Sequence, residues 1–144
     1  MYKILRKVEL SPGILELDIE APRVAKKAQP GQFIVLRVND EGERVPLTIA
    51  DFDGEKGTVT ILFQVVGAST ELLASLEEGD AILDFVGPLG QPSEISEHMG
   101  TVVFVGGGIG VAPVYPIARA VHELGNKVIS ILGAKTKDML ILED

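Results

Sequence analysis

The 144-residue chain contains no cysteine, no tryptophan and only two histidines. Without cysteine it forms no disulfide, carries no thiol nucleophile and offers no thiolate ligand to a metal or an iron–sulfur cluster. His98 and His122 are far apart in the sequence and lack the companions of a metal site, so we interpret both as structural. We therefore expect no catalytic residue of the thiol type and no metal bound by this chain.

Basic residues are also scarce, with 13 Lys and Arg against 21 Asp and Glu and a formal net charge of -8. This balance argues against nucleic acid as a partner, because a phosphate backbone requires a positive surface. A small phosphate-bearing ligand needs only a local site and stays possible. Apolar residues make up 46% of the chain, which supports a sizeable core.

Targeting and membrane signals are missing as well. The first ten residues alternate charged and apolar side chains and contain no apolar h-region, so we expect no signal peptide and a cytoplasmic location. Residues 99–118 are uncharged over a length that could cross a bilayer. Glycines and prolines interrupt this stretch, which favours a buried strand–loop–helix unit and no membrane span.

The first hundred residues show the period-two alternation of strands separated by Gly, Pro and Asp turns. This pattern predicts a six-stranded antiparallel β-barrel over residues 1–96. One helix, over residues 70–78, is ended by Gly79. The expected strands cover residues 3–10, 14–20, 33–38, 47–51, 58–66 and 80–86.

After a boundary near residues 92–99 the pattern changes to that of an α/β unit. A β-branched strand at 101–105, a helix at 111–124 and a strand at 128–132 predict the start of a parallel sheet, and residues 137–144 look like a further helix. Two parallel strands leave both edges of a sheet uncovered. We therefore expect a fragment of a longer protein, or a partner that completes the sheet.

The segment VGGGIGVAP, residues 105–113, lies between the first of these strands and the helix. Glycines before a helix N-terminus allow a diphosphate to approach backbone amides, and Pro113 suits the first helical turn. The segment does not satisfy G-x-G-x-x-G, and no acidic residue follows the second strand. By itself it is compatible with either phosphate binding or a tight structural turn.

Four motifs taken together resemble the ferredoxin–NADP reductase superfamily. They are RVPLT at 44–48, GAST at 67–70, GPLG at 87–90 and GGGIGVAP at 106–113. In that family a barrel holds a flavin and the next domain holds a nicotinamide dinucleotide. The resemblance implies an FAD-binding barrel followed by an incomplete Rossmann-like NAD(P)-binding unit, residues 97–144.

Within the superfamily two kinds of subunit look most similar. One is the flavin subunit of NADH-dependent ferredoxin:NADP oxidoreductase, also called sulfide dehydrogenase, which the segments RVPLTIAD and GAKTKDMLILED resemble more. The other is the electron-transfer subunit of dihydroorotate dehydrogenase. Both carry a cysteine-ligated [2Fe–2S] cluster near the C-terminus, a region that this chain does not reach. The resemblance also implies a second catalytic flavoprotein or iron–sulfur subunit and ferredoxin as partners.

The resemblance places the flavin on RVPLT, on GAST and on the strand before GAST, residues 61–66. Arg44 would pair with the diphosphate in forked geometry, and Leu47 and Thr48 would face the isoalloxazine edge. The alternative is an edge strand with a solvated arginine and a bulge at Pro46. The implied FAD site consists of Arg44, Pro46, Leu47, Thr48, Leu62, Phe63, Gln64, Gly67, Ser69 and Thr70.

The helix after Gly67 supports this placement, because no Glu or Gln follows Ser69 or Thr70 at the capping-box spacing. Its first amides are therefore open to an anion, unless Ser69 is an ordinary N-cap. The NAD(P) site would consist of Gly106, Gly107, Gly108, Ile109, Gly110 and Pro113. The choice between NAD and NADP stays open, since Lys135 and Lys137 suit either a 2′-phosphate or solvent.

These observations lead us to expect an FAD-dependent oxidoreductase subunit that passes electrons between NAD(P)H, FAD and an iron–sulfur centre or ferredoxin. Hydride transfer needs no general acid or base, so we name no catalytic side chain. We expect the 144 residues alone to bind FAD, to oxidise little NAD(P)H and to self-associate. The alternatives are the dihydroorotate dehydrogenase subunit and a non-enzymatic β-barrel interaction module whose glycine loop is structural.

Overall fold

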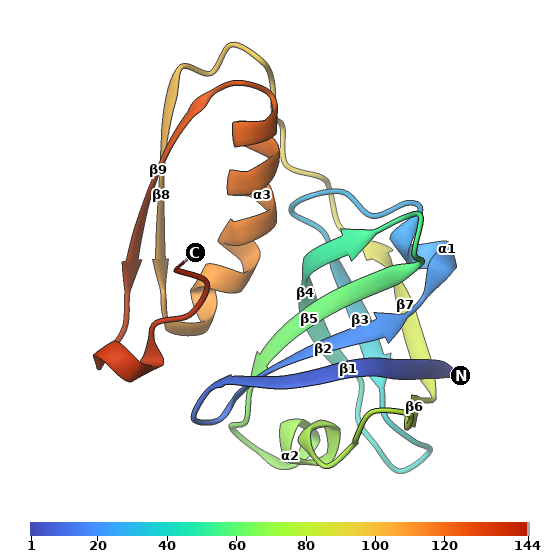
Figure 1. The fold of residues 1–144 in the computed structure, drawn as a ribbon. Coiled ribbons are helices and arrows are strands. Elements are labelled where there is room, and N and C mark those ends of the chain that lie inside the picture. Colours follow the sequence, from blue (N-terminus) through green and yellow to red (C-terminus); the bar gives the residue numbers. More distant parts are fainter. Residues whose placement is uncertain (144) are drawn as a thin grey trace.

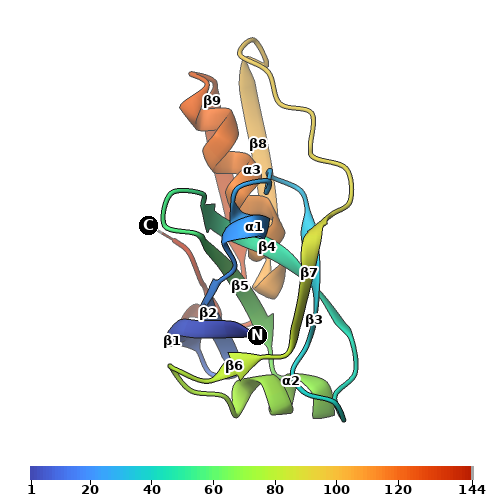
Figure 2. The same cartoon turned by 90° about the vertical axis from the view of Figure 1, so that its right-hand side faces the viewer.

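Seven antiparallel strands form a strongly curved sheet in the computed structural model, which describes residues 1–143 (Figure 1). Their order across the sheet is β6-β1-β2-β5-β4-β3-β7. Two short helices, α1 (Pro22–Ala25) and α2 (Ala68–Ala74), lie at opposite ends of this barrel-like sheet (Figure 2). The strands are β1 (Tyr2–Ser11), β2 (Ile14–Glu20), β3 (Phe33–Arg37), β4 (Val45–Asp53), β5 (Thr58–Gln64), β6 (Ala81–Ile82) and β7 (Asp84–Leu89).

The expected count of six strands is wrong because the strand predicted at 80–86 is divided at Leu83. Its first part, β6, pairs with β1, whereas its second part, β7, pairs with β3 at the opposite edge of the sheet. The amide of Leu83 donates to the carbonyl of Val38 at 3.1 Å, which fixes this crossing. The two edges therefore meet at one corner, and the sheet nearly closes into a barrel.

Alternation along the strands places one row of apolar side chains inside the barrel. Each such side chain, when fully buried, stabilises the fold by about 1.5–3 kcal/mol relative to an exposed one. Leu73 of α2 and Val24 of α1 join the same core from the two ends. The fully buried strand residues include Ile4, Leu17, Ile19, Ile34, Leu36, Ile49, Val59, Ile61 and Phe63.

The remainder of the chain forms a parallel strand–helix–strand unit, as the sequence predicts. It consists of β8 (Thr101–Gly107), the short 3-10 turn η1 (Gly108–Gly110), α3 (Val111–Glu123) and β9 (Lys127–Gly133). The helix predicted at 137–144 is wrong within the described residues. A single 3-10 turn, η2 (Lys137–Met139), is followed by Leu140 in extended conformation. Asp144 lies outside the described residues.

The α3 helix packs against β4 through a second apolar cluster, which joins the barrel to the strand–helix–strand unit. Ile14, Ala50 and Leu62 of the barrel contribute to it, together with Val111 and Ala112 of α3. Ile141 is also buried there, at 3% exposure. This burial explains the missing helix, because the apolar residues after η2 fill the gap between barrel and α3.

The connection between β7 and β8, residues 90–100, has no regular structure but is anchored by a buried asparagine. Asn126 accepts a hydrogen bond from the amide of Met99 at 2.8 Å and donates to the carbonyl of Ser96 at 2.8 Å. It lies just after the C-terminal end of α3, where Gly125 adopts a φ of 87°. One side chain thus holds the connection against the strand–helix–strand unit.

Candidate flavin and nucleotide site

A pocket of about 400 Å³ lies where β4, β5 and the first turns of α2 and α3 come together. A pocket of this size accommodates a small-molecule ring system. The lining of this pocket is mostly apolar, with a few polar groups. Most of the residues predicted for the two nucleotides line it, although they come from three distant segments. They are Pro46, Leu47, Thr48, Leu62, Phe63, Gln64, Thr70, Ile109, Gly110 and Pro113.

The strand side of the pocket is formed by β4 and β5. Pro46 is exposed, and Leu47, Thr48 and Gln64 are partly exposed. The side chains of Leu62 and Phe63 are only 4% and 2% exposed, because they belong to the two apolar clusters. A ligand would therefore contact the side chain of Gln64, but chiefly the backbone of Phe63.

The glycines of the β8–α3 loop divide into two groups. A Cβ on Gly106 would lie 3.0 Å from Cγ2 of Val111, so this glycine allows the strand to pack closely on the helix. A Cβ on Gly107, Gly108 or Gly110 would meet no atom within 4 Å. The open space beside these three residues leaves the backbone accessible to a ligand, whereas Gly106 has a packing role.

The helix expected at 70–78 is shorter and begins earlier, since α2 runs from Ala68 to Ala74. Gly67, with an extended φ of 175°, is the N-cap, so the alternative in which Ser69 is the N-cap is wrong. Thr70 Oγ1 accepts hydrogen bonds from the amides of Val66 and Gly67 at 2.9 and 3.1 Å and donates to the carbonyl of Gly67 at 2.9 Å. Thr70 thereby fixes the turn, and Ser69 donates to Glu43 at 3.2 Å.

Arg44 lies just before β4 and is exposed. Within residues 1–143 it takes part in no ion pair. Its neighbour Glu43 binds Ser69, so the loop that carries Arg44 is tied to the start of α2. Arg44, Gly67 and Ser69 do not line the pocket itself; they belong to the loop and turn that adjoin it through Pro46 and Thr70.

Two lining residues were not predicted, Val66 and Ala112. Val66, two residues after the end of β5, is 76% exposed, which is unusual for a valine so close to a core strand. Its position immediately before the GAST motif is the signal that could have identified it. Ala112 lies between the glycine loop and Pro113, and nothing in the sequence distinguishes it from an ordinary helical alanine.

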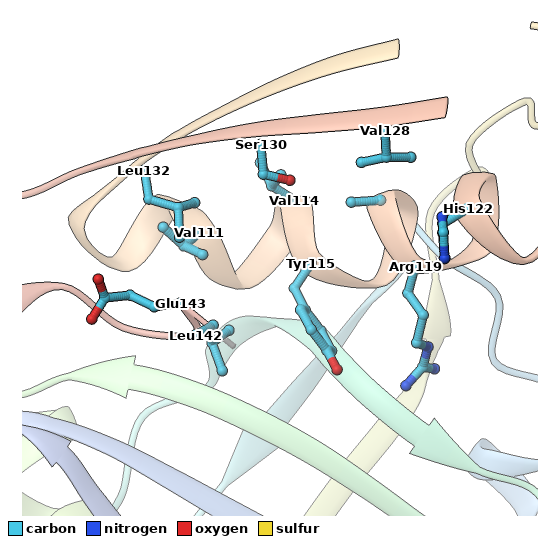
Figure 3. Close-up of a pocket in the computed structure, with 11 residues that line it drawn as sticks. Val111, Val114, Tyr115, Arg119, His122, Val128, Ser130, Leu132, Leu142 and Glu143 are labelled. Carbon is cyan, nitrogen blue, oxygen red and sulfur yellow. The ribbon is translucent and has the colours of Figure 1, made fainter. Parts of the chain in front are cut away.

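Another hollow, of about 410 Å³, lies between α3, β9 and residues 142–143 (Figure 3). Its lining combines apolar side chains such as Val111 and Leu132 with Arg119, His122 and Glu143. None of the predicted nucleotide-binding residues lines it, so it is not the candidate site. Within the described part of the chain there is no cluster of His, Asp and Glu suited to a metal. No helix there has the length and apolar character needed to span a bilayer.

Comparison with known proteins agrees with this architecture. No protein-family model matches the chain. An uncharacterized protein from the adh 3' region of Clostridium beijerinckii is 56% identical over 150 residues, which cover 100% of this chain and 51% of that protein. A Thermotoga maritima protein named as an electron transfer subunit homolog of dihydroorotate dehydrogenase B (NAD(+)) is 49% identical over 144 residues, with 100% and 51% coverage.

A solved structure of an NADH-dependent reduced ferredoxin-NADP oxidoreductase superposes with a TM-score of 0.95 at 48% identity and covers 100% of this chain and 52% of that one. Ferredoxin-NADP+ reductase from Plasmodium falciparum shares the fold, with a TM-score of 0.81 at 14% identity over 99% of this chain and 61% of that one. The chain spans about half the length of the curated relatives that it matches. By sequence and by fold, it belongs to the ferredoxin–NADP reductase superfamily.

Proposed function

We propose that the pocket holds the flavin of FAD and that this chain is the flavin-binding part of an electron-transfer oxidoreductase subunit. The observation that carries the proposal is the convergence of three motifs on one pocket. RVPLT contributes Pro46 to Thr48, GAST contributes Thr70, and the glycine loop contributes Ile109, Gly110 and Pro113. Residues so far apart in the sequence meet there only because β4, α2 and α3 each direct one end toward it.

The residues present fit FAD in size and in chemistry. Leu47 and Pro46 offer an apolar surface for a ring, and Thr48 and Gln64 offer hydrogen-bonding groups at its edge. Arg44, Gly67 and Ser69 would receive the diphosphate beyond the pocket, since Arg44 is an exposed cation without an ion-pair partner in residues 1–143. The open backbone at Gly107, Gly108 and Gly110 would receive the nicotinamide dinucleotide.

Bound FAD would supply the redox chemistry, accepting a hydride from NAD(P)H and releasing single electrons to an iron–sulfur centre or to ferredoxin. The protein's part is to orient the two nucleotides and to exclude water between them. Because these 144 residues contain no cysteine, a cysteine-ligated [2Fe–2S] cluster would be held outside them. We retain the division into a flavin domain, residues 1–96, and an NAD(P)-binding unit, residues 97–144, as part of the proposal.

Two partner assignments remain in competition. The solved ferredoxin-NADP oxidoreductase is 48% identical to this chain, whereas proteins named outright as electron transfer subunits of dihydroorotate dehydrogenase B are 34–36% identical, which favours the oxidoreductase. The relative at 49% is named only as a homolog of the dihydroorotate dehydrogenase subunit. One assignment gives a subunit of a ferredoxin:NADP oxidoreductase, and the other gives the electron-transfer subunit of a dihydroorotate dehydrogenase. Electron transfer from dihydroorotate in the complex isolated from cells would establish the second and exclude the first.

Titration of the purified 144-residue chain with FAD tests the proposal directly. We expect quenching of flavin fluorescence, saturable binding and little flavin reduction by NADH or NADPH, since one strand–helix–strand unit supplies only part of a dinucleotide site. A chain that binds no FAD would favour the non-enzymatic interaction module. Rapid flavin reduction in a strictly monomeric sample would contradict the expectation that these residues alone are inactive with NAD(P)H.

A further inference from the structure

An ion pair links the barrel to α3 at a distance from the pocket. Arg119 Nη1 lies 2.6 Å from Asp51 Oδ1. Within residues 1–143 this is the one ion pair between the seven-stranded sheet and the β8–α3–β9 unit. Figure 3 shows the side chains of Arg119 and Tyr115 extending from the same side of α3 toward the strands of the barrel.

Asp51 reaches α3 because β4 contains a β-bulge. The pairing of β4 with β5 shifts between Ile49 and Asp51, so Ala50 is an additional residue on β4. Ala50 is buried in the cluster that includes Val111 and Ala112, and Asp51 follows it. The amide of Phe52 donates to Asp51 Oδ1 at 2.7 Å, which fixes the direction of the carboxylate.

Arg119 is also held in place on its own helix. Its Cζ lies 5.7 Å from the centroid of the Tyr115 ring, and its Nε lies 3.8 Å from Oε1 of Glu123. Burial lowers the pKa of Arg119, but the interactions with Asp51, Tyr115 and Glu123 together raise it above its ordinary value. The guanidinium therefore stays charged, and its partners on α3 restrict the rotamers that it can adopt.

The ion pair joins the same two elements that form opposite sides of the pocket. On β4, Asp51 follows Thr48 by three residues, or about 10 Å of strand. On α3, Arg119 follows Ala112 by seven residues, or about 10 Å of helix. We propose that Asp51 and Arg119 are a positioning pair that fixes the angle between β4 and α3, and with it the width of the pocket between Thr48 and the glycine loop.

A role in stability alone does not explain the pair. Its side chains are 34% and 36% exposed, and ion pairs of this kind contribute little to the free energy of unfolding. Adhesion between barrel and helix comes from the apolar cluster around Ala50 and Val111. Apolar contact has no preferred direction, so it allows α3 to rock on the sheet. The ion pair restricts that rocking, since tilting α3 away from β4 would separate two opposite charges that lie 2.6 Å apart.

Distance measurement on the whole 144-residue chain tests the pair without any cofactor. The chain has no native cysteine, so spin labels can be attached at Lys27→Cys on the barrel and Lys127→Cys on β9. We expect a narrow distance distribution in the parent, a clearly broader one in Arg119→Met and Asp51→Asn, and an intermediate one in Arg119→Lys. Lys56→Ala, which removes an ion pair confined to the barrel, should leave the distribution unchanged.

Distributions in Arg119→Met and Asp51→Asn as narrow as the parent's would overturn the inference. A distance distribution in Arg119→Lys as broad as that in Arg119→Met would also overturn the inference, because charge pairing would then not be the cause of the narrow distribution. If Arg119→Met does not fold, the distance distribution in Asp51→Asn decides the question, because the amide oxygen of the asparagine can still accept the hydrogen bond from the amide of Phe52.

The connection to the pocket rests on the proposed function and needs its own readout. In the FAD-loaded chain, Arg119→Met should make the flavin more accessible to iodide, with a quenching constant raised by about two-fold. Its FAD dissociation constant should stay within about two-fold of the parent's, since the diphosphate residues are untouched. A broadened distance distribution with unchanged iodide quenching would overturn the link to pocket width. A parent that binds no FAD would refute the proposed function, while the spin-label distances would still decide the positioning pair.

Discussion

The hydroxyl of Ser69 donates a hydrogen bond to Oε2 of Glu43 at 3.2 Å, across 26 residues of sequence. This contact joins the first turn of α2 to the loop that carries Arg44. It brings together two of the residues proposed to receive a diphosphate. It also places a carboxylate beside them, so the same loop contains one group that would attract the ligand and one that would repel it.

Substitution of Arg44 by alanine should weaken FAD binding. Loss of a charge-assisted, forked interaction with a phosphate costs about 1.5–3 kcal/mol, which is roughly one to two decades in dissociation constant. Arg44→Lys should be intermediate because it keeps the charge and loses the fork. Arg23→Ala, at the opposite end of the barrel, is the matched control. Fluorescence titration that finds parental affinity in a folded Arg44→Ala protein would refute the assignment.

Glu43→Gln should strengthen FAD binding. The substitution removes a negative charge next to the proposed diphosphate and weakens the hold of residue 43 on Ser69. For exposed charges of this kind we expect a gain of about 0.5–1 kcal/mol, or roughly two- to five-fold in affinity. The gain in FAD affinity should diminish at high salt, and Glu41→Gln should produce a smaller gain. Weaker binding by Glu43→Gln would mean that the Glu43–Ser69 contact shapes the site instead of competing with the ligand.

FAD should bind more tightly than FMN. The pocket accommodates the ring system, whereas Arg44, Gly67 and Ser69 lie beyond its lining, where only a diphosphate would reach them. We expect a preference of at least about ten-fold. In Arg44→Ala the preference should shrink, because FMN does not depend on this residue to the same extent. Equal dissociation constants for the two flavins in the parent protein would show that the diphosphate site is misplaced.

Gly106→Ala should destabilise the protein, whereas Gly107→Ala should leave its stability nearly unchanged. The new Cβ at 106 would lie 3.0 Å from Cγ2 and 3.1 Å from Cα of Val111, so β8 or α3 must shift. Overpacking of this kind costs about 1–3 kcal/mol in the free energy of unfolding. At 107 no atom lies within 4 Å, and we expect a change within about 0.5 kcal/mol. Denaturant unfolding of the two variants side by side gives the comparison, and equal stabilities would contradict the packing role of Gly106.

The uncovered face of β8 and β9 should make the 144-residue chain self-associate. Val103 and Ile129 face each other across the two strands, as do Val105 and Ile131, with exposures between 42% and 69%. Such a contiguous apolar patch with free strand edges is a contact surface. Sedimentation should show oligomers that Val105→Lys dissociates and Leu5→Lys, on the barrel, does not. A parent that stays monomeric at high concentration would contradict this prediction.

Much of the architecture could be predicted because its causes are local. Period-two alternation indicated the barrel strands, and the β-branched run at 101–105 indicated a strand of the parallel unit. The division at Leu83 has no clear signal, since residues 81–86 form a short apolar segment, interrupted only by Asp84, that looks like a single strand. It results from closure of the sheet, which requires one segment to pair with both β1 and β3.

The C-terminal segment and the site also combine features with local causes and features that depend on tertiary packing. Met139 to Leu142 have helix-forming side chains, but burial of Ile141 against the barrel outweighs that propensity. The residues that the family resemblance implied for the two nucleotides include ten that line the pocket, and their role in binding stays a prediction. The pair Asp51–Arg119 could not be predicted, because it joins two single residues far apart and depends on a bulge at Ala50.

Closure of the barrel at β6 has a consequence for the order of folding. Tyr2 pairs with Ile82 and Lys3 with Ala81, so the second neighbour of the N-terminal strand is about eighty residues away in the chain. Contacts with such large sequence separation form late, because loop-closure entropy must be overcome first. During synthesis, β1 can pair with β2 at once, but its outer edge stays open until β6 has left the ribosome. We therefore expect β6, only two residues long, to complete the barrel last and to protect the N-terminal strand from premature pairing with other chains.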